Sequence, residues 1–437
     1  MTTPSPVEFG RAICGDLDAA ERREWLVTNG LGGFASGTIA GTLTRRYHGL
    51  LVAALRPPVE RTLLVAKLDE SARYRGAGYE LAANRWKDGY LSPRGWLAIE
   101  HFSLDGTTPV WHYALADALL EKRVWMAPDA NTTYVRYRAL RSRSPIELSL
   151  RALVNYRGFH ATTHAGSWEL GVSAVPHGLR VDAFAGARPY WLVADGGEAS
   201  IENAWYRDFV LIEETRRGLD DRDDHCCAGV FTATLGPGDA ITICASDTDP
   251  SGFDAERAAG ERAARDAEVL GAWERQPAAS RAPAWISRCA LAADAFVVRR
   301  PIASDPHALS IVAGYHWFAD WGRDTMISLP GLALATGRPE IAKQILLAFS
   351  SFVEGGMLPN CFPDAGEAPQ YNTVDAALWY VEAVARYAGA GGDRETLARL
   401  LPSLESVIAG YRDGTRYGIH MDRDGLIVAN APGMQLT

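Results

Sequence analysis

Residues 108–140, TPVWHYALADALLEKRVWMAPDANTTYVRYRAL, decide the fold of the first half of the chain. The stretch contains three short runs rich in Val, Tyr and Trp, at Thr108–Leu115, Leu119–Met126 and Thr132–Leu140. Pro, Asp and Asn residues separate the runs, and these residues favour turns. Closely spaced runs with turn signals between them predict the antiparallel strands of a sandwich.

The same pattern continues on both sides of this stretch. Further short runs lie at Leu63–Leu68, Gly95–Phe102, Ile146–Asn155, Trp191–Ala194, Phe209–Glu213 and Ala240–Ala245. No comparable run follows before the composition changes near residue 275. We therefore predict an N-terminal antiparallel β-sandwich domain over residues 1–253.

The rest of the chain has a helical period. Residues 254–281 begin with a charged, Ala-rich stretch, Asp254–Arg275, which predicts a solvated helix linking two domains. Apolar residues then recur on one helical face in the segments Trp285–Val297, Ile341–Val353, Ala376–Tyr387 and Leu397–Tyr411. With Thr325–Ala335, which Asp324 would cap, these segments predict about five helices in residues 282–437. Strands first and helices second define an α+β multidomain protein.

Composition excludes several classes of protein. The chain has 437 residues, of which 47% are hydrophobic and 22% charged, so it can bury a large core. Its net charge of −9 argues against nucleic acid or an anionic membrane as the main partner. The first residues lack a signal peptide, and no apolar run is long enough to span a bilayer. Six sparse cysteines fit reduced thiols, so we expect a cytoplasmic protein.

Three motifs are formal matches that the context does not support. Gly30-x-Gly32-x-x-Ala35 matches a dinucleotide fingerprint, but Gly37 interrupts any following helix and the next region is basic. His160 and His164 have zinc-helix spacing without the expected Glu. The adjacent thiols of His225-Cys226-Cys227 do not easily share one tetrahedral site. We predict a glycine-rich hairpin or an irregular strand pair at the first motif and no metal at the others.

Residues 317–325, WFADWGRDT, give the first strong signal for a binding site. They place Trp317, Trp321, Arg323 and Asp324 just before a predicted helix. Adjacent Arg and Asp side chains offer donors and acceptors to vicinal hydroxyls, and Trp offers a face for stacking. The same residues also fit a helix N-cap at Asp324, and the two interpretations are compatible.

A second polar and aromatic loop opens another helix. It contains Asn360, then Tyr371 and Asn372, and the helical spacing of Asn372, Asp375 and Trp379 places an amide, a carboxylate and an indole on one face. Alone, these residues fit capping and core packing. Two such loops in one helical domain favour entry loops that converge on a pocket for a sugar.

The motifs together resemble a known family. Asn29-Gly30-Leu31-Gly32-Gly33-Phe34 and Arg45-Arg46-Tyr47-His48-Gly49 resemble the N-terminal domain of bacterial and archaeal glycogen debranching enzymes. Trp321-Gly322-Arg323-Asp324-Thr325, Pro359-Asn360 and the segment Tyr371–Tyr380 resemble the start of the amylo-α-1,6-glucosidase catalytic domain. The motifs touch both halves of the chain in the order expected of the family.

The resemblance implies a partial (α/α)6 toroidal barrel of glucoamylase type and inverting hydrolysis of α-1,6-linked glucose at branch points. Arg323 and Asp324 match the pair that holds the non-reducing-end glucose, and Trp321 would line that subsite. Tyr371, Asn372, Asp375 and Trp379 match an entry loop that shapes the pocket. The implied ligands are glycogen, limit dextrin or branched maltooligosaccharides, with no cofactor or metal, and the oligomeric state is left open.

The resemblance also implies that the general acid and base lie beyond Thr437. About five helices precede that residue, whereas the family's barrel has twelve. We therefore expect a chain truncated within its catalytic domain, inactive alone and poorly soluble because an apolar edge is left open. The alternatives are a glucoamylase-like α-1,4-glucan hydrolase, a non-catalytic glucan-binding protein and an inactive gene fragment.

Overall fold

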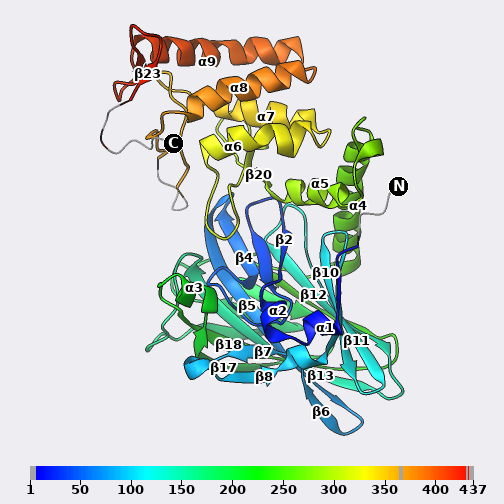
Figure 1. Cartoon of the computed structure of the whole chain (residues 1–437). Coiled ribbons are helices and arrows are strands. Elements are labelled where there is room, and N and C mark those ends of the chain that lie inside the picture. Colours follow the sequence, from blue (N-terminus) through cyan, green and yellow to red (C-terminus); the bar gives the residue numbers. More distant parts are fainter. Residues whose placement is uncertain (1–5, 364–367, 430–431, 433–437) are drawn as a thin grey trace.

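The computed structural model describes residues 6–363, 368–429 and 432. Strands fill the first part of the chain and helices dominate the last part, and in Figure 1 the helices lie together at one end of the strands. We call β1–β19 the sandwich and the elements from α5 onward the helical unit.

The first sheet has nine antiparallel strands in the order β1-β9-β10-β11-β12-β19-β16-β15-β14. Their bounds are β1 Glu8–Gly10, β9 Ile99–Asp105, β10 Thr108–Leu115, β11 Ala118–Met126, β12 Thr132–Arg141, β14 Gly171–Val175, β15 Gly178–Asp182, β16 Tyr190–Ala194 and β19 Ala240–Ser246.

The second sheet runs in the order β17-β18-β13-β5-β4-β3-β2, with β6 paired to β5. Its strands are β2 Glu24–Thr28, β3 Phe34–Thr38, β4 Gly49–Arg56, β5 Val59–Tyr74, β6 Ala77–Glu80, β13 Ile146–Gly158, β17 Glu198–Val210 and β18 Arg222–Leu235. The pair β7 Ala83–Arg85 and β8 Leu91–Arg94 flanks the helical turn η1 Lys87–Gly89. Short helices occupy α1 Arg11–Cys14, α2 Leu17–Glu21, α3 Ile212–Arg216 and η2 Gly95–Ala98.

The two sheets pack on one continuous apolar core. Alternating residues of β13, such as Leu148 and Leu150, lie in the same cluster as Tyr113 of β10 and Val124 of β11. An edge-to-face pair with ring centroids 5.5 Å apart joins Trp25 and Trp111 across the cluster. Alternation therefore places one face of each sheet inward.

Most of the predicted strands are confirmed. The prediction for Thr108–Leu115 matches β10 at both ends, and those for 119–126, 132–140 and 240–245 are within one residue. Two predictions are wrong in part. Gly95–Ala98 forms a 3-10 turn before β9, and the 209–213 run ends its strand at Val210 and enters α3. The two segments are only four and five residues long, and the pattern of apolar residues in so short a run does not distinguish a strand from a helical turn.

The glycine-rich motif forms the hairpin β2-β3, as predicted, with no helix after it. Gly32 has φ +92°, and a side chain there would place its Cβ 2.5 Å from the carbonyl oxygen of Pro58. Glycine is therefore required for backbone packing at this turn, and the dinucleotide interpretation has no structural support.

The predicted linker helix is α4 Ala255–Glu274, capped by Asp254, whose side chain accepts from the Arg257 amide at 2.9 Å. The helix is not fully solvated, because Arg262 and Asp266 are buried against the sandwich. Asp266 accepts from the Thr107 amide at 2.7 Å. The linker is thus fixed to the first sheet.

The helical unit contains the five predicted helices. They are α5 Ile286–Ala295, α6 Gly322–Leu329, α7 Pro339–Ser350, α8 Ala376–Gly389 and α9 Arg394–Asp413. Other elements are η3 Ala279–Arg281, the π-helical turn η4 Pro330–Leu334, and the strand pairs β20 Val297–Arg299 with β21 Leu309–Ile311 and β22 His420–Met421 with β23 Ile427–Val428. Asp324 is not the cap of α6. The helix begins at Gly322, which places Asp324 inside its first turn.

Within the described residues, no helix is long and apolar enough to cross a membrane.

Candidate functional site

The two entry loops predicted from the sequence meet at the start of α6. The Gly322 amide donates to the carbonyl oxygen of Asn360 at 2.8 Å, and Trp321 forms a β-bridge with Cys361. A side chain at 322 would place its Cβ 2.0 Å from the Pro359 carbonyl oxygen. Glycine at this position therefore allows the loops to touch.

The second loop is held by its own side chains. Asn360, which is buried, donates from Nδ2 to Oδ1 of Asn372 at 3.2 Å. Asp375 accepts from the Thr373 hydroxyl at 3.0 Å and from Trp379 Nε1 at 3.3 Å. Both oxygens of the Asp375 carboxylate are thus oriented before any ligand arrives.

Arg323 links the two loops. Its Nη1 lies 3.8 Å from Oδ1 of Asp375, and its Nε lies 4.0 Å from Oδ2 of Asp324. Nη1 is buried and has no hydrogen-bond partner among the described residues. Because a buried donor without an acceptor is costly, this nitrogen marks a place where a ligand oxygen would be stabilised.

Aromatic rings border this group. Trp379 is 38% exposed, and Phe318, which is 45% exposed, lies edge-to-face against Trp321 with ring centroids 5.7 Å apart. Phe318 was not among the predicted site residues, although it lies inside the 317–325 stretch. An aromatic residue within that polar stretch was the signal in the sequence. Rings beside polar groups provide the faces on which sugars stack.

Two predicted residues lie elsewhere. The Tyr371 hydroxyl donates to the Phe352 carbonyl oxygen at 2.9 Å, while the Arg416 guanidinium covers its ring. Trp317 turns toward the sandwich, where the guanidinium of Arg45 lies 5.4 Å from its ring centroid. Tyr371 and Trp317 therefore make their contacts with other parts of the chain. The remaining seven of the nine predicted residues lie at or beside the two loops: Trp321, Arg323, Asp324, Asn360, Asn372, Asp375 and Trp379.

One group of side chains has the donor types of a metal site. The ligand atoms of Glu24, His48 and His316 all lie within 4.8 Å of one another, where the sandwich meets the helical unit. The Thr44 amide donates to Nδ1 of His48 at 3.2 Å, which leaves the ring proton on Nε2, the atom that faces Glu24. A protonated Nε2 cannot bind a metal ion. The group is therefore better described as a buried polar contact.

Charge in this contact is fixed by its surroundings. Burial raises the pKa of Glu24, but hydrogen bonding with His48 and Arg45 outweighs this effect and lowers the pKa to about 2. Burial lowers the pKa of His316 to about 3, so the ring is neutral at pH 7. Its Nε2 lies 3.0 Å from the Ser36 hydroxyl.

The histidines singled out in the sequence have other partners. Nε2 of His164 lies 2.9 Å from Asp220, and Nδ1 of His160 lies 3.2 Å from the Tyr47 hydroxyl. His225 is buried, with Nδ1 3.1 Å from Asn155 Nδ2. Burial also raises the pKa of the neighbouring Cys226 thiol to about 11, which favours the protonated form over a thiolate ligand.

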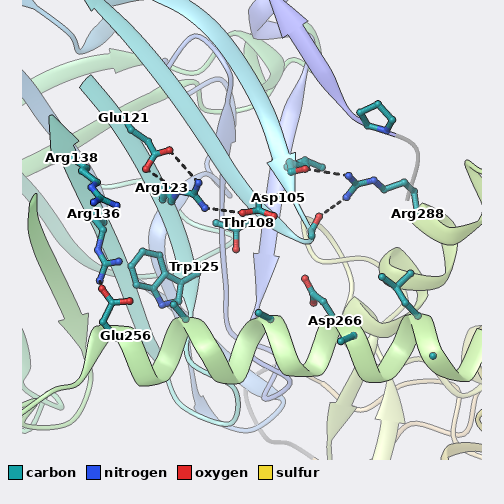
Figure 2. A pocket seen from close by; sticks show the side chains of 18 of the residues that line it. Asp105, Thr108, Glu121, Arg123, Trp125, Arg136, Arg138, Glu256, Asp266 and Arg288 are labelled. Atoms are coloured by element: carbon teal, nitrogen blue, oxygen red, sulfur yellow. Dashed lines mark hydrogen bonds and ion pairs between the residues drawn. The ribbon is translucent and has the colours of Figure 1, made fainter. Parts of the chain in front are cut away.

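A cavity of about 910 Å3 lies between the first sheet and α4, away from the predicted loops (Figure 2). Its charges are largely paired: Arg123 with Asp105 at 2.8 Å, and Arg136 with Glu256 at 2.8 Å. Arg288 donates to backbone carbonyl oxygens at the edge of the cavity. The Arg136–Glu256 pair joins the linker helix to the sheet, and no predicted site residue lines the cavity.

Comparison with known proteins agrees with this architecture. The family model described as glycogen debranching enzyme N terminal matches residues 23–242, and the model described as amylo-alpha-1,6-glucosidase matches residues 291–437. The glycogen debranching enzyme of Saccharomyces cerevisiae is 48% identical over 67 residues, which are 15% of this chain and 4% of the yeast protein.

Solved structures match more of the chain at low identity. A protein from the human microbiome assigned as a kojibiose phosphorylase has a TM-score of 0.51 and 11% identity, covering 97% of this chain and 61% of its own. This match supports a shared fold and nothing further. A bacterial glucoamylase complexed with acarbose covers 88% of this chain and 57% of its own at 10% identity, but its TM-score of 0.45 is too low to support a conclusion.

The order of a sandwich followed by a helical unit agrees with the order of the two family models, the second of which is described as an amylo-alpha-1,6-glucosidase. The chain belongs to the glycogen debranching enzyme family. The chain covers only a fraction of the length of the yeast relative and about three fifths of the kojibiose phosphorylase.

Proposed function

We propose that this protein acts in glycogen debranching, by inverting hydrolysis of α-1,6-linked glucose at the branch points of glycogen or limit dextrin. Residues 1–253 would form the sandwich domain, 254–281 the linker and 282–437 the first part of an (α/α)6 glycosidase domain. No cofactor is needed, because glycosidic hydrolysis of this kind uses carboxylates and water. A cytoplasmic location fits a storage glucan as substrate.

The observation that carries the proposal is Nη1 of Arg323, which has no hydrogen-bond partner among the described residues and lies 3.8 Å from the oriented carboxylate of Asp375. A glucose ring presents vicinal hydroxyls, each both a donor and an acceptor. One hydroxyl would accept from Arg323 while a neighbouring one donates to Asp375, and the exposed ring of Trp379 would contact the apolar face of the sugar. We assign these residues to binding and not to proton transfer.

The first test measures binding of a 6-α-glucosyl maltooligosaccharide by calorimetry. Removing a charged hydrogen-bonding group costs about 1.5–3 kcal/mol, so Arg323→Ala is expected to weaken binding by roughly ten- to a hundredfold. Arg386→Ala is the matched control, because Arg386 is exposed on the surface of α8 and pairs only with Glu382 among the described residues. Unchanged binding by the Arg323 variant would contradict the proposed site.

The second test measures glucose released from limit dextrin by the protein expressed from its natural reading frame. Release that stops in the Arg323 variant supports debranching. Release from linear α-1,4 chains but not from limit dextrin would replace debranching with the glucoamylase-like alternative. Binding without release from either substrate would instead favour a glucan-binding protein.

A further inference from the structure

We propose a second carbohydrate-binding site, a trough across the outer face of the second sheet that takes a single neutral α-glucan chain. The choice of an α-glucan rests on the proposed function, while the trough itself rests on the geometry of the sheet.

The floor of the trough is a row of small hydroxyl side chains. Ser149 of β13 lies opposite both Thr232 of β18 and Ser71 of β5 in the strand register. Glu198 of β17 pairs with Thr232 at one end of the row, and Glu80 of β6 pairs with Ser71 at the other. Because adjacent strands lie about 4.8 Å apart, this row crosses five strands over about 19 Å.

Larger side chains stand on both sides of that row. Arg151 of β13 and Asp69 of β5 form a pair two residues from Ser149 and Ser71 in one direction along the strands. Glu147 and Arg73 form the corresponding pair in the other direction. Same-face neighbours along a strand are about 7 Å apart, so the small row is a depression between two taller ones. The depression is a hollow of about 720 Å3.

One side of the trough is aromatic. On the Arg151 side, a second hollow of about 730 Å3 shares Ser71 and Glu80 with the first and is lined by Trp86, Tyr90 and Tyr206. Tyr90 is 64% exposed, although tyrosine in a folded protein usually buries much of its ring. Such rings beside a hydroxyl-lined trough provide stacking surfaces for sugar units.

The polar groups beside these rings are held in place by one another. The Tyr206 hydroxyl donates to Oε1 of Glu202 at 2.8 Å, and Arg151 Nε donates to Oε2 at 3.3 Å. The Arg151 guanidinium also lies 5.5 Å from the Tyr206 ring centroid. Acidic and basic groups alternate along the trough, so a neutral chain of hydroxyls fits it better than a polyanion.

The trough is separate from the Arg323 site. In Figure 1, β6, β17, β18 and the β7–β8 pair lie at the end of the sandwich that faces away from the helices. A polymer reaches both places and a short oligosaccharide does not. Binding of the polymer at the trough would therefore raise the local concentration of branches near the helical unit.

The experiment is affinity electrophoresis of the protein in gels containing glycogen. Ser149→Tyr fills the middle of the floor, and Tyr90→Ala removes the exposed ring. The matched controls are Ser173→Tyr on β14, an exposed strand serine outside the trough, and Phe184→Ala, an aromatic residue that is 54% exposed elsewhere. Circular dichroism shows whether each variant is folded.

We expect Ser149→Tyr to weaken retardation by glycogen at least tenfold and Tyr90→Ala by about threefold to tenfold, with both controls unchanged. Ser149→Tyr is expected to bind the 6-α-glucosyl maltooligosaccharide with unchanged affinity in calorimetry, which separates the trough from the Arg323 site. Folded Ser149→Tyr protein retarded like the wild type would overturn the proposal, as would the absence of any retardation of the wild type. Equal retardation by a β-glucan would overturn the choice of an α-glucan.

Discussion

The sandwich and the helical unit close their apolar surfaces differently. Both faces that meet inside the sandwich are covered, and 48 buried residues form one cluster. The helical unit has its own buried cluster, yet it also exposes Ile327 of α6 at 48%, Leu378 of α8 at 40% and Ile408 of α9 at 59%. In Figure 1 the helices form a layer rather than a closed ring.

This difference shows how much each kind of element depends on its neighbours. The strands of the sandwich find their hydrogen-bonded neighbours within residues 8–246, although Phe34 and Leu63 also share a buried cluster with Tyr315 of the helical unit. An amphipathic helix can present apolar residues beyond the face that one neighbour covers. The sandwich should therefore respond to mutations inside it, and the helical unit should respond to changes at its surface as well.

The largest expected effect is the loss of a buried charge pair in the sandwich. Asp223 accepts from Arg157 at 2.7 Å, and both side chains are at most 5% exposed. Asp223→Ala leaves the guanidinium unpaired, so we expect unfolding to become easier by about 3–5 kcal/mol in urea denaturation followed by circular dichroism. Asp182→Ala, which breaks an exposed pair with Arg180, is the control and should cost less than about 1 kcal/mol. Similar costs for the two variants would contradict the comparison.

A smaller effect is expected where the two units meet. Asp294 of α5 accepts from Arg265 of α4 at 2.6 Å and pairs with Arg338 after η4. Asp294→Asn should destabilise the protein by about 2 kcal/mol at pH 7, since both arginines keep other partners.

Burial raises the pKa of Asp294, but Arg265 and Arg338 lower it more, so the net shift is downward. A depressed pKa gives stability that is present above the unfolded value of about 3.9 and lost as pH falls below it. The difference in unfolding free energy between wild type and variant should thus shrink as pH falls below about 3.9, and a difference that stays constant there would contradict this assignment.

Much of the fold follows from local sequence pattern. The alternating run at 108–115 became β10 because Trp111, Tyr113 and Leu115 face the other sheet, and the charged stretch that begins at Asp254 became the helix α4. The failures come from contacts that pattern does not encode. Asp324 lies within α6 because Gly322 packs on the Pro359 carbonyl, a contact across more than thirty residues.

The candidate site was likewise predictable only in part from the sequence. The spacing of Asp375 and Trp379 predicted that they share one helical face, and in the structure a hydrogen bond joins them. That Trp317 turns to Arg45 was not predictable, because Arg45 is supplied by the sandwich, more than 270 residues earlier. The absence of the general acid and base from this chain stays a prediction.

A third test uses pH to probe the contact between the units. The low pKa of Glu24, about 2, means that its ionised form stabilises the fold above about pH 4.3 and that this contribution is lost as pH falls through 4 toward 2. Glu24→Gln should remove this pH dependence and cost about 1 kcal/mol, because the carboxylate is partly exposed and screened.

Trp317 lies against His316 with ring centroids 5.7 Å apart, so its emission, obtained as the difference between the protein and its Trp317→Phe variant, reports the change. An acid transition in Trp317 emission with the same midpoint in the Glu24→Gln variant would assign the titration to another group.

The smallest effect on stability is expected at the exposed face of α9. Leu401 and Ile408 are 51% and 59% exposed and lie seven residues apart, so they share one side of the helix. Ile408→Glu should change the free energy of unfolding by less than about 0.5 kcal/mol, because the side chain has little burial to lose.

The same substitution should reduce self-association at high protein concentration, measured by light scattering, because a charge interrupts the apolar face. Arg399→Ala, at an exposed position of the same helix, also lowers the net charge by one and controls for charge alone. Equal scattering by the two variants would mean that charge, and not the apolar face of α9, governs association. Reduced scattering by Ile408→Glu alone would show that the apolar face of α9 drives association.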